Sequence, residues 1–114
     1  MNAETIFGFV IISLVAVIMA IIGLVQFNKK DEPVGFYNVI DPPKKEEITN
    51  ILLWNKKHGI IWIFYGICIE LGFWMGSVMP NEVLEIVFMI GGVIIPLPIM
   101  ILRHNMLERE YRRG

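Results

Sequence analysis

Cysteine and histidine are scarce in this sequence, which contains one cysteine, Cys68, and two histidines, His58 and His104. One cysteine excludes a disulfide within the chain. A metal ion shared by the histidines is conceivable, but two ligands make an incomplete site, so we predict no metal and favour hydrogen bonding near helix ends. The sequence also lacks a phosphate-binding glycine loop, HExxH, CxxC and a nucleophile elbow. We therefore expect a non-enzymatic protein with no cofactor and no nucleic-acid partner.

Charge is nearly absent from three long apolar runs, at residues 5–27, 59–79 and 83–102. Each run reaches the roughly 20 residues that a helix needs to cross the hydrocarbon core of a bilayer. The 114-residue chain is 55% hydrophobic and its mean hydropathy is +0.61. A soluble domain of this size could not bury three helices that are apolar on nearly every face. We predict an all-α membrane protein whose three transmembrane helices form a single membrane domain over residues 1–114.

Basic residues are missing from the N-terminal segment and from the turn between the second and third runs. All ten lie between the first two runs or after the third. The positive-inside bias then places the N-terminus outside, residues 28–58 in the cytoplasm and a basic C-terminal tail, residues 103–114, also in the cytoplasm. No Lys or Arg precedes the first run, so we expect it to be retained rather than cleaved as a signal peptide. The sequence therefore predicts a multi-pass membrane protein with this orientation.

The connection between the first two spans predicts a further helix. Asp41 is a suitable N-cap, and Pro42 and Pro43 suit a first turn, which lacks intrahelical acceptors for its N–H groups. We predict an amphipathic helix over residues 42–57 that lies in the cytoplasmic interface, with Trp54 as an anchor. Its role stays open between a plain connector and a docking surface for a partner or ligand.

Small residues predict how the spans pack. The first span carries a small-residue face that we expect to meet a similar face on the second span, around Gly66. Gly72 and Gly76 form a second close-approach face, for the third span or for another subunit. Pro96 and Pro98 predict a kink near the inner end of the third span. The face of the first span consists of Ser13, Ala16, Ala20 and Gly23.

Glu70 is the only charged residue within the second run. At 1.5 Å per residue it lies roughly 16 Å from the start of that run, near the middle of a bilayer. A charged carboxylate there costs on the order of 2.5 to 3.5 kcal/mol, so Glu70 should avoid lipid or be neutral. Two interpretations stay open: a neutral clamp between helices, for example with Ser13, or a group that handles protons, cations or a cationic ligand.

Two short motifs flank the predicted interfacial helix: Gly35-Phe36-Tyr37-Asn38 before it, and Trp54-Asn55-Lys56-Lys57-His58-Gly59 at its end. Together with the order of the spans over residues 5–102, they resemble the small bacterial membrane proteins related to SdpI, although Tyr37 stands where that family usually has arginine. The resemblance implies a location in the bacterial inner membrane and immunity against secreted toxic peptides. A toxic peptide or a partner protein would then be bound by the inner segment and the bundle. The candidate contact residues are Gly35, Phe36, Tyr37, Trp54, Asn55, His58 and Glu70.

Two other functions stay open. A holin-type pore-forming protein also fits three spans, an outside N-terminus and a charged inner tail, although the 31-residue inner connection is longer than a compact pore-former needs. A proton-coupled transport subunit would depend on Glu70. For each function the expected partners are membrane lipid and either a second copy of the chain or another membrane protein, with a peptide as the ligand in the first case.

Overall fold

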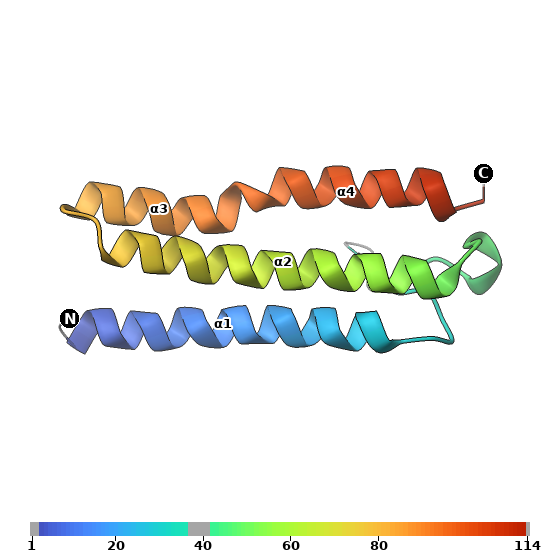
Figure 1. Cartoon of the computed structure of the whole chain (residues 1–114), viewed down its shortest axis with the longest axis horizontal. Coiled ribbons are helices and arrows are strands. Elements are labelled where there is room, and N and C mark those ends of the chain that lie inside the picture. The colour runs from blue at the N-terminus through green and yellow to red at the C-terminus, as the bar shows by residue number, and fades with distance from the viewer. Residues whose placement is uncertain (1–2, 37–41, 114) are drawn as a thin grey trace.

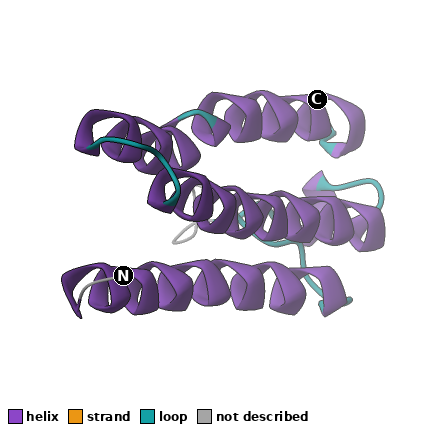
Figure 2. Ribbon diagram, turned by 60° about the vertical axis from the view of Figure 1, so that its left-hand side comes forward, coloured by secondary structure: helices purple, strands orange, loops and turns teal. Residues whose placement is uncertain are grey.

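The helices lie side by side along the long axis of the molecule, with α2 between α1 and the segment formed by α3 and α4 (Figure 1). The computed structural model describes residues 3–36 and 42–113. Its elements are α1 (Ala3–Asn28), a short 3₁₀ helix η1 (Lys45–Glu47), α2 (Ile51–Ser77), α3 (Glu82–Ile94) and α4 (Pro96–Tyr111). Helices α3 and α4 follow one another along that segment. The same arrangement is seen from a second direction in Figure 2.

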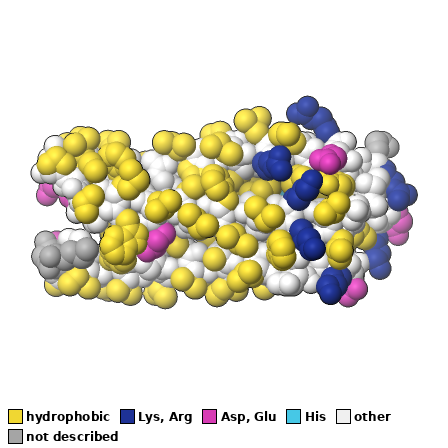
Figure 3. Space-filling view, in the orientation of Figure 1, with side chains coloured by type: hydrophobic (Ala, Val, Ile, Leu, Met, Phe, Trp, Pro, Cys, Tyr) yellow, Lys and Arg dark blue, Asp and Glu magenta, His cyan; other side chains and the backbone are white. Residues whose placement is uncertain are grey.

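As predicted, the structure has three helical segments that are each long and apolar enough to cross a membrane: α1, α2, and α3 together with α4. The 27 residues of α2 correspond to about 40 Å, close to the thickness of a bilayer with its headgroups. Large apolar side chains cover the outside of the helices; Phe7, for example, is 68% exposed. Figure 3 shows this apolar surface, with Lys and Arg gathered towards the right-hand end. We call this the basic end; α1 ends, α2 begins and α4 ends there.

The separate interfacial helix predicted at residues 42–57 is not present among the described residues, and Asp41 lies outside them. Residues 42–44 are not helical, η1 spans only three residues, and α2 begins at Ile51 instead of at the predicted Gly59. Asn50 caps α2, because its side-chain oxygen accepts a hydrogen bond of 3.2 Å from the backbone N–H of Leu53. Nothing then interrupts the helix at Gly59, so residues 51–57 form its first two turns.

The close approach of α1 and α2 is confirmed. A Cβ atom placed on Gly23 would lie 2.5 Å from the carbonyl oxygen of Gly59, and one on Gly66 would lie 2.8 Å from the carbonyl oxygen of Ala16. Such separations leave no room for a side chain, so the two backbones touch along this line. Ala16 and Gly23 are accordingly the two buried residues of α1.

The second glycine face contacts the third span. A Cβ atom on Gly72 would lie 2.8 Å from the Cα atom of Gly92, and one on Gly76 would lie 2.8 Å from the carbonyl oxygen of Glu85. The predicted kink is present as the break between α3 and α4 at Ile95. Pro96 causes it because a proline has no N–H to donate to the preceding turn. Residues 103–111 belong to α4 rather than to a tail.

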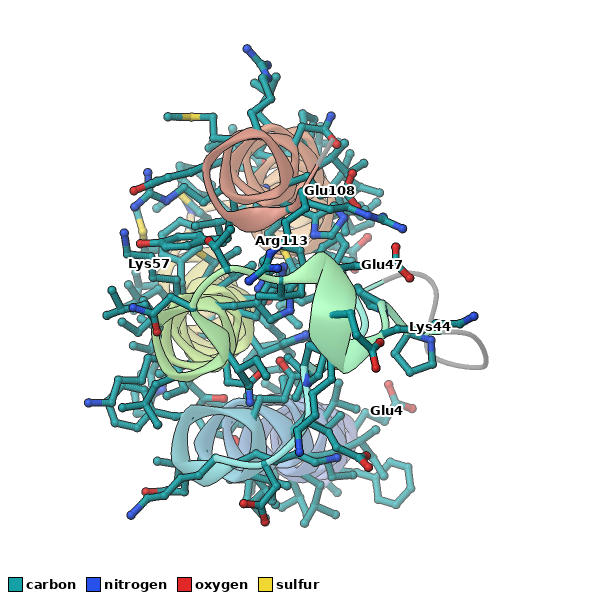
Figure 4. All side chains as sticks on the ribbon, turned by 90° about the vertical axis from the view of Figure 1, so that its right-hand side faces the viewer. Glu4, Lys44, Glu47, Lys57, Glu108 and Arg113 are labelled. Carbon is teal, nitrogen blue, oxygen red and sulfur yellow. The ribbon has the colours of Figure 1, made fainter. Side chains whose placement is uncertain are left out.

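The basic end is closed by contacts between the η1 segment and the end of α4, which we call the C-terminal latch. Ile48 and Arg112 form an isolated antiparallel bridge. The backbone N–H of Thr49 donates to Tyr111 O at 2.7 Å, and that of Arg113 donates to Glu47 O at 2.7 Å. Figure 4 looks onto this end and labels Glu47 and Arg113.

Candidate functional site

Asn55, near the start of α2, forms hydrogen bonds with the segment that follows α1. Its side chain is fully buried. Its Oδ1 accepts a hydrogen bond of 2.9 Å from the backbone N–H of Val34. Its Nδ2 donates to Lys29 O at 3.0 Å and to Glu32 O at 2.9 Å. Three hydrogen bonds from one buried amide hold residues 29–34 against α2.

Trp54 contributes to the same attachment and does not anchor α2 in a lipid interface. Its side chain has 0% exposure, and its Nε1 donates to Val34 O at 3.0 Å. Because α2 is continuous from Ile51, Trp54 faces the segment after α1 and helix α4 instead of the bilayer. Phe36 is buried as well, and Gly35 O accepts a hydrogen bond of 3.3 Å from Gln26 Nε2. Tyr37 lies outside the described residues.

His58 and His104 form a buried pair that joins α2 to α4. His58 Nε2 lies 2.8 Å from His104 Nδ1, and His58 Nδ1 lies 2.8 Å from the carbonyl oxygen of Trp54. The side chains are 0% and 1% exposed. Aromatic rings enclose them: Phe36 stacks on His104 with centroids 4.8 Å apart, and Trp54 lies 4.2 Å from His58. The two histidines are therefore joined by a hydrogen bond, as predicted.

Glu108 lies next to the histidine pair. His104 Nε2 lies 3.3 Å from Glu108 Oε1, and this contact is an ion pair only when His104 is protonated. The described residues contain no group of three His, Cys, Asp or Glu side chains that could hold a metal ion.

Glu70 occupies a different place, at the interface of α1 and α2. Its Oε1 accepts hydrogen bonds of 3.0 Å from Ser13 Oγ and of 3.0 Å from Trp74 Nε1. Its Oε2 is buried and has no hydrogen-bond partner among the described residues. An apolar groove of about 230 Å³ adjoins the carboxyl group. The groove is lined by Ser13, Ala16, Val17, Ala20, Gly66, Ile67 and Glu70.

The predicted contact residues thus divide into two groups. Gly35, Phe36, Trp54, Asn55 and His58 gather at the basic end, where the polar atoms of Trp54, Asn55 and His58 are satisfied inside the protein. Glu70 follows His58 by 12 residues in α2, or about 18 Å. The residues that α4 contributes to the first group were not predicted. The signal was present as a helical repeat of buried residues at 100, 104, 107 and 111.

Fold and site define a helical protein with three candidate membrane spans, a hydrogen-bonded polar cluster at the basic end, and Glu70, whose Oε2 is buried without a hydrogen-bond partner among the described residues. No protein-family model, no curated protein and no solved structure matches the chain. The resemblance to SdpI-like proteins therefore stays a prediction.

Proposed function

We propose that this chain is a non-enzymatic protein of the bacterial inner membrane that binds a membrane-inserted partner at Glu70. The partner is a toxic peptide, in an immunity-like role, or a helix of another membrane protein. The observation that carries the proposal is the buried Glu70 Oε2, which has no hydrogen-bond partner among the described residues. The other carboxyl oxygen accepts two hydrogen bonds, so the group is only half satisfied.

An unsatisfied carboxyl oxygen in hydrocarbon is costly, and a donor supplied by a partner removes that cost. A lysine or arginine gives the strongest such bond, because both groups are then ionised. The groove beside Glu70 includes two small, half-buried side chains, Ser13 and Ala20, which let another helix approach closely, whereas Ala16 and Gly66 are already buried between α1 and α2. The ten basic residues of this chain lie outside the three predicted spans, so a second copy does not offer a lysine or arginine at this depth. This favours a different chain as the partner.

Association with two synthetic transmembrane peptides tests the proposal. Both are leucine–alanine helices, one with a central lysine and the other with leucine at that position. The full chain, in a Cys68→Ser background and labelled at a cysteine introduced for Asn81, is reconstituted in vesicles, and energy transfer to each labelled peptide is measured. We expect about tenfold tighter association of the lysine peptide, from one charge-assisted hydrogen bond.

Substitutions identify the group responsible. Glu70→Gln should reduce the preference for the lysine peptide, and Glu70→Leu should abolish it. Glu85→Gln is the matched control, because it removes a carboxylate from α3 away from the groove, and it should keep the preference. Equal association of both peptides with the unsubstituted chain, or an unchanged preference in Glu70→Leu, would contradict the proposal.

A further inference from the structure

A second groove lies between α2 and α4 near the basic end, on a part of the surface that the proposed function does not use. It has a volume of about 250 Å³. Its floor is formed by Ile61 and Met100, which are 5% and 2% exposed, and its rims by more exposed apolar side chains. Glycine contacts bring α3 close to α2, whereas α4 contains no glycine. The rim residues are Ile60, Phe64 and Ile99.

The groove has a polar end and an apolar end. Lys57 lines it one turn before Ile60 in α2, and Arg103 lines it one turn after Ile99 in α4. The two helices run in opposite directions, so both cations lie at the end of the groove nearer the basic end (Figure 1). From Lys57 to Phe64 the groove extends about 10 Å towards the middle of the molecule. An amphiphile with an anionic head and an apolar tail would match this groove, because its head would meet the two cations and its tail would lie along the apolar residues.

Both cations are available to an anion. Lys57 Nζ donates to the Tyr111 hydroxyl at 2.8 Å and lies 3.8 Å from Glu110 Oε1. The Glu110 side chain is 58% exposed, and an ion pair with so exposed a partner is screened by solvent. Glu110 therefore neutralises the charge of Lys57 only weakly. Within residues 3–36 and 42–113, Arg103 has no ion-pair partner. No acidic side chain lines the groove. Its mouth therefore carries two positive charges over an apolar channel.

We propose that this groove binds an anionic phospholipid from the leaflet on the side of the basic end. Its phosphate contacts Lys57 and Arg103, and part of one acyl chain lies along Ile61 and Met100. Basic pockets between transmembrane helices recognise anionic headgroups in this way, since the cations meet the phosphate at headgroup depth while apolar side chains cover the tail. The groove opens directly to the bilayer, so the lipid enters it from the side.

Native mass spectrometry of the full chain, purified in detergent and depleted of lipid, measures this binding. The probes are dioleoyl phosphatidylglycerol and dioleoyl phosphatidylcholine. We expect at least about tenfold tighter binding of phosphatidylglycerol, because a basic residue near a membrane surface contributes about a factor of five in affinity for anionic lipid. Arg103→Gln should weaken phosphatidylglycerol binding about fivefold and leave phosphatidylcholine binding unchanged.

Matched variants separate the groove from the general charge of the basic end. Arg109→Gln removes a positive charge from the same helix outside the groove and should have no effect. Ile99→Trp keeps both cations but fills the channel and should weaken binding of phosphatidylglycerol. Equal binding of the two lipids, equal effects of Arg103→Gln and Arg109→Gln, or full phosphatidylglycerol binding by Ile99→Trp would each overturn the proposal. So would displacement of the lipid by equimolar inorganic phosphate, because the site would then recognise the phosphate alone.

Discussion

Two polar side chains inside the bundle, Asn55 and Glu70, are satisfied to different degrees. Asn55 uses its oxygen and both hydrogens of its amide in bonds to backbone groups. Glu70 uses one oxygen, while the other is buried without a partner among the described residues. A fully bonded group specifies a fold, whereas an unsatisfied one is available for a partner. This contrast assigns Asn55 to structure and makes Glu70 the candidate for binding.

Removal of the Asn55 amide should destabilise the protein strongly. In Asn55→Ala the buried N–H of Val34 and two backbone carbonyls lose their partner, and we expect a loss of about 3 kcal/mol in the free energy of unfolding. Unfolding of the full chain by sodium dodecyl sulfate, followed by circular dichroism, measures it. Asn28→Ala is the control, because Asn28 is exposed and makes one bond, to Leu24 O. Similar losses in both variants would contradict the assigned role of Asn55.

The histidine pair shows what residue types alone cannot determine. The sequence placed His58 and His104 at inner helix ends, and hydrogen bonding was the correct expectation. The additional contact of His104 with Glu108 depends on the rotation of α4 about its axis, which residue types alone do not determine. The interfacial role predicted for Trp54 was wrong because its amphipathic ring suits a membrane surface and a hydrogen-bonded interior equally well.

At the scale of elements, the spans could be predicted because length and hydropathy are local properties of the sequence. The prediction of a separate interfacial helix was wrong because the sequence offers two possible helix starts within residues 41–51. Pro42 and Pro43 favour the first start, but residues 42–44 are not helical, and helix α2 begins after the cap supplied by Asn50. Residues 47–49 instead pair with the end of α4, more than 60 residues away in sequence, and no local pattern reveals such pairing.

The glycine contacts predict opposite effects for two identical substitutions. In Gly66→Ala the new Cβ would lie 2.8 Å from Ala16 O, so α1 and α2 must separate and stability should fall by about 2 kcal/mol. In Gly91→Ala it would meet only Ile95 Cδ1 at 3.5 Å, an ordinary contact. The higher helix propensity of alanine should then make Gly91→Ala neutral or stabilising by up to about 1 kcal/mol. Thermal unfolding in detergent compares the two, and equal effects would contradict this account of the α1–α2 interface.

The C-terminal latch should weaken in acid. Arg112 donates to Glu47 Oε2 at 2.7 Å, and this hydrogen bond lowers the pKa of Glu47 from its usual 4.5. A lowered pKa means that the contact stabilises the folded latch above pH 4.5, and that this stabilisation is lost as the pH falls through the lowered pKa. Exchange of the Thr49 and Arg113 amide hydrogens, corrected for intrinsic rates, should therefore accelerate in acid.

Two variants test the origin of that acid effect. In Glu47→Gln the latch should already exchange quickly at neutral pH and respond little to further acid. Glu46→Gln, which changes the adjacent carboxylate, should behave like the unsubstituted chain. Unchanged exchange in Glu47→Gln would show that the two backbone hydrogen bonds hold the latch without the ion pair.

At the scale of the whole molecule, charge is distributed unevenly along the long axis, which extends 53 Å. Lys and Arg gather at one end and apolar side chains cover most of the rest (Figure 3). The molecule is longer than the roughly 40 to 45 Å thickness of a bilayer with its headgroups, so part of it must project from a membrane that it crosses. The polar latch, with its ion pairs among Glu47, Glu108 and Arg112, is the part best suited to water.

This distribution predicts the orientation of the chain. We expect the basic end in the cytoplasm and the opposite end outside, because clusters of Lys and Arg next to a span are retained on the cytoplasmic side. Single cysteines replace Lys44 and Arg109 at the basic end, or Glu4 and Glu82 at the other, in a Cys68→Ser background. All four positions are exposed in the structure. In intact cells an impermeant maleimide should label only the cysteines at positions 4 and 82, and in permeabilised cells it should label all four. Labelling of position 44 before permeabilisation would reverse the orientation, and would also move the proposed phospholipid site to the opposite leaflet.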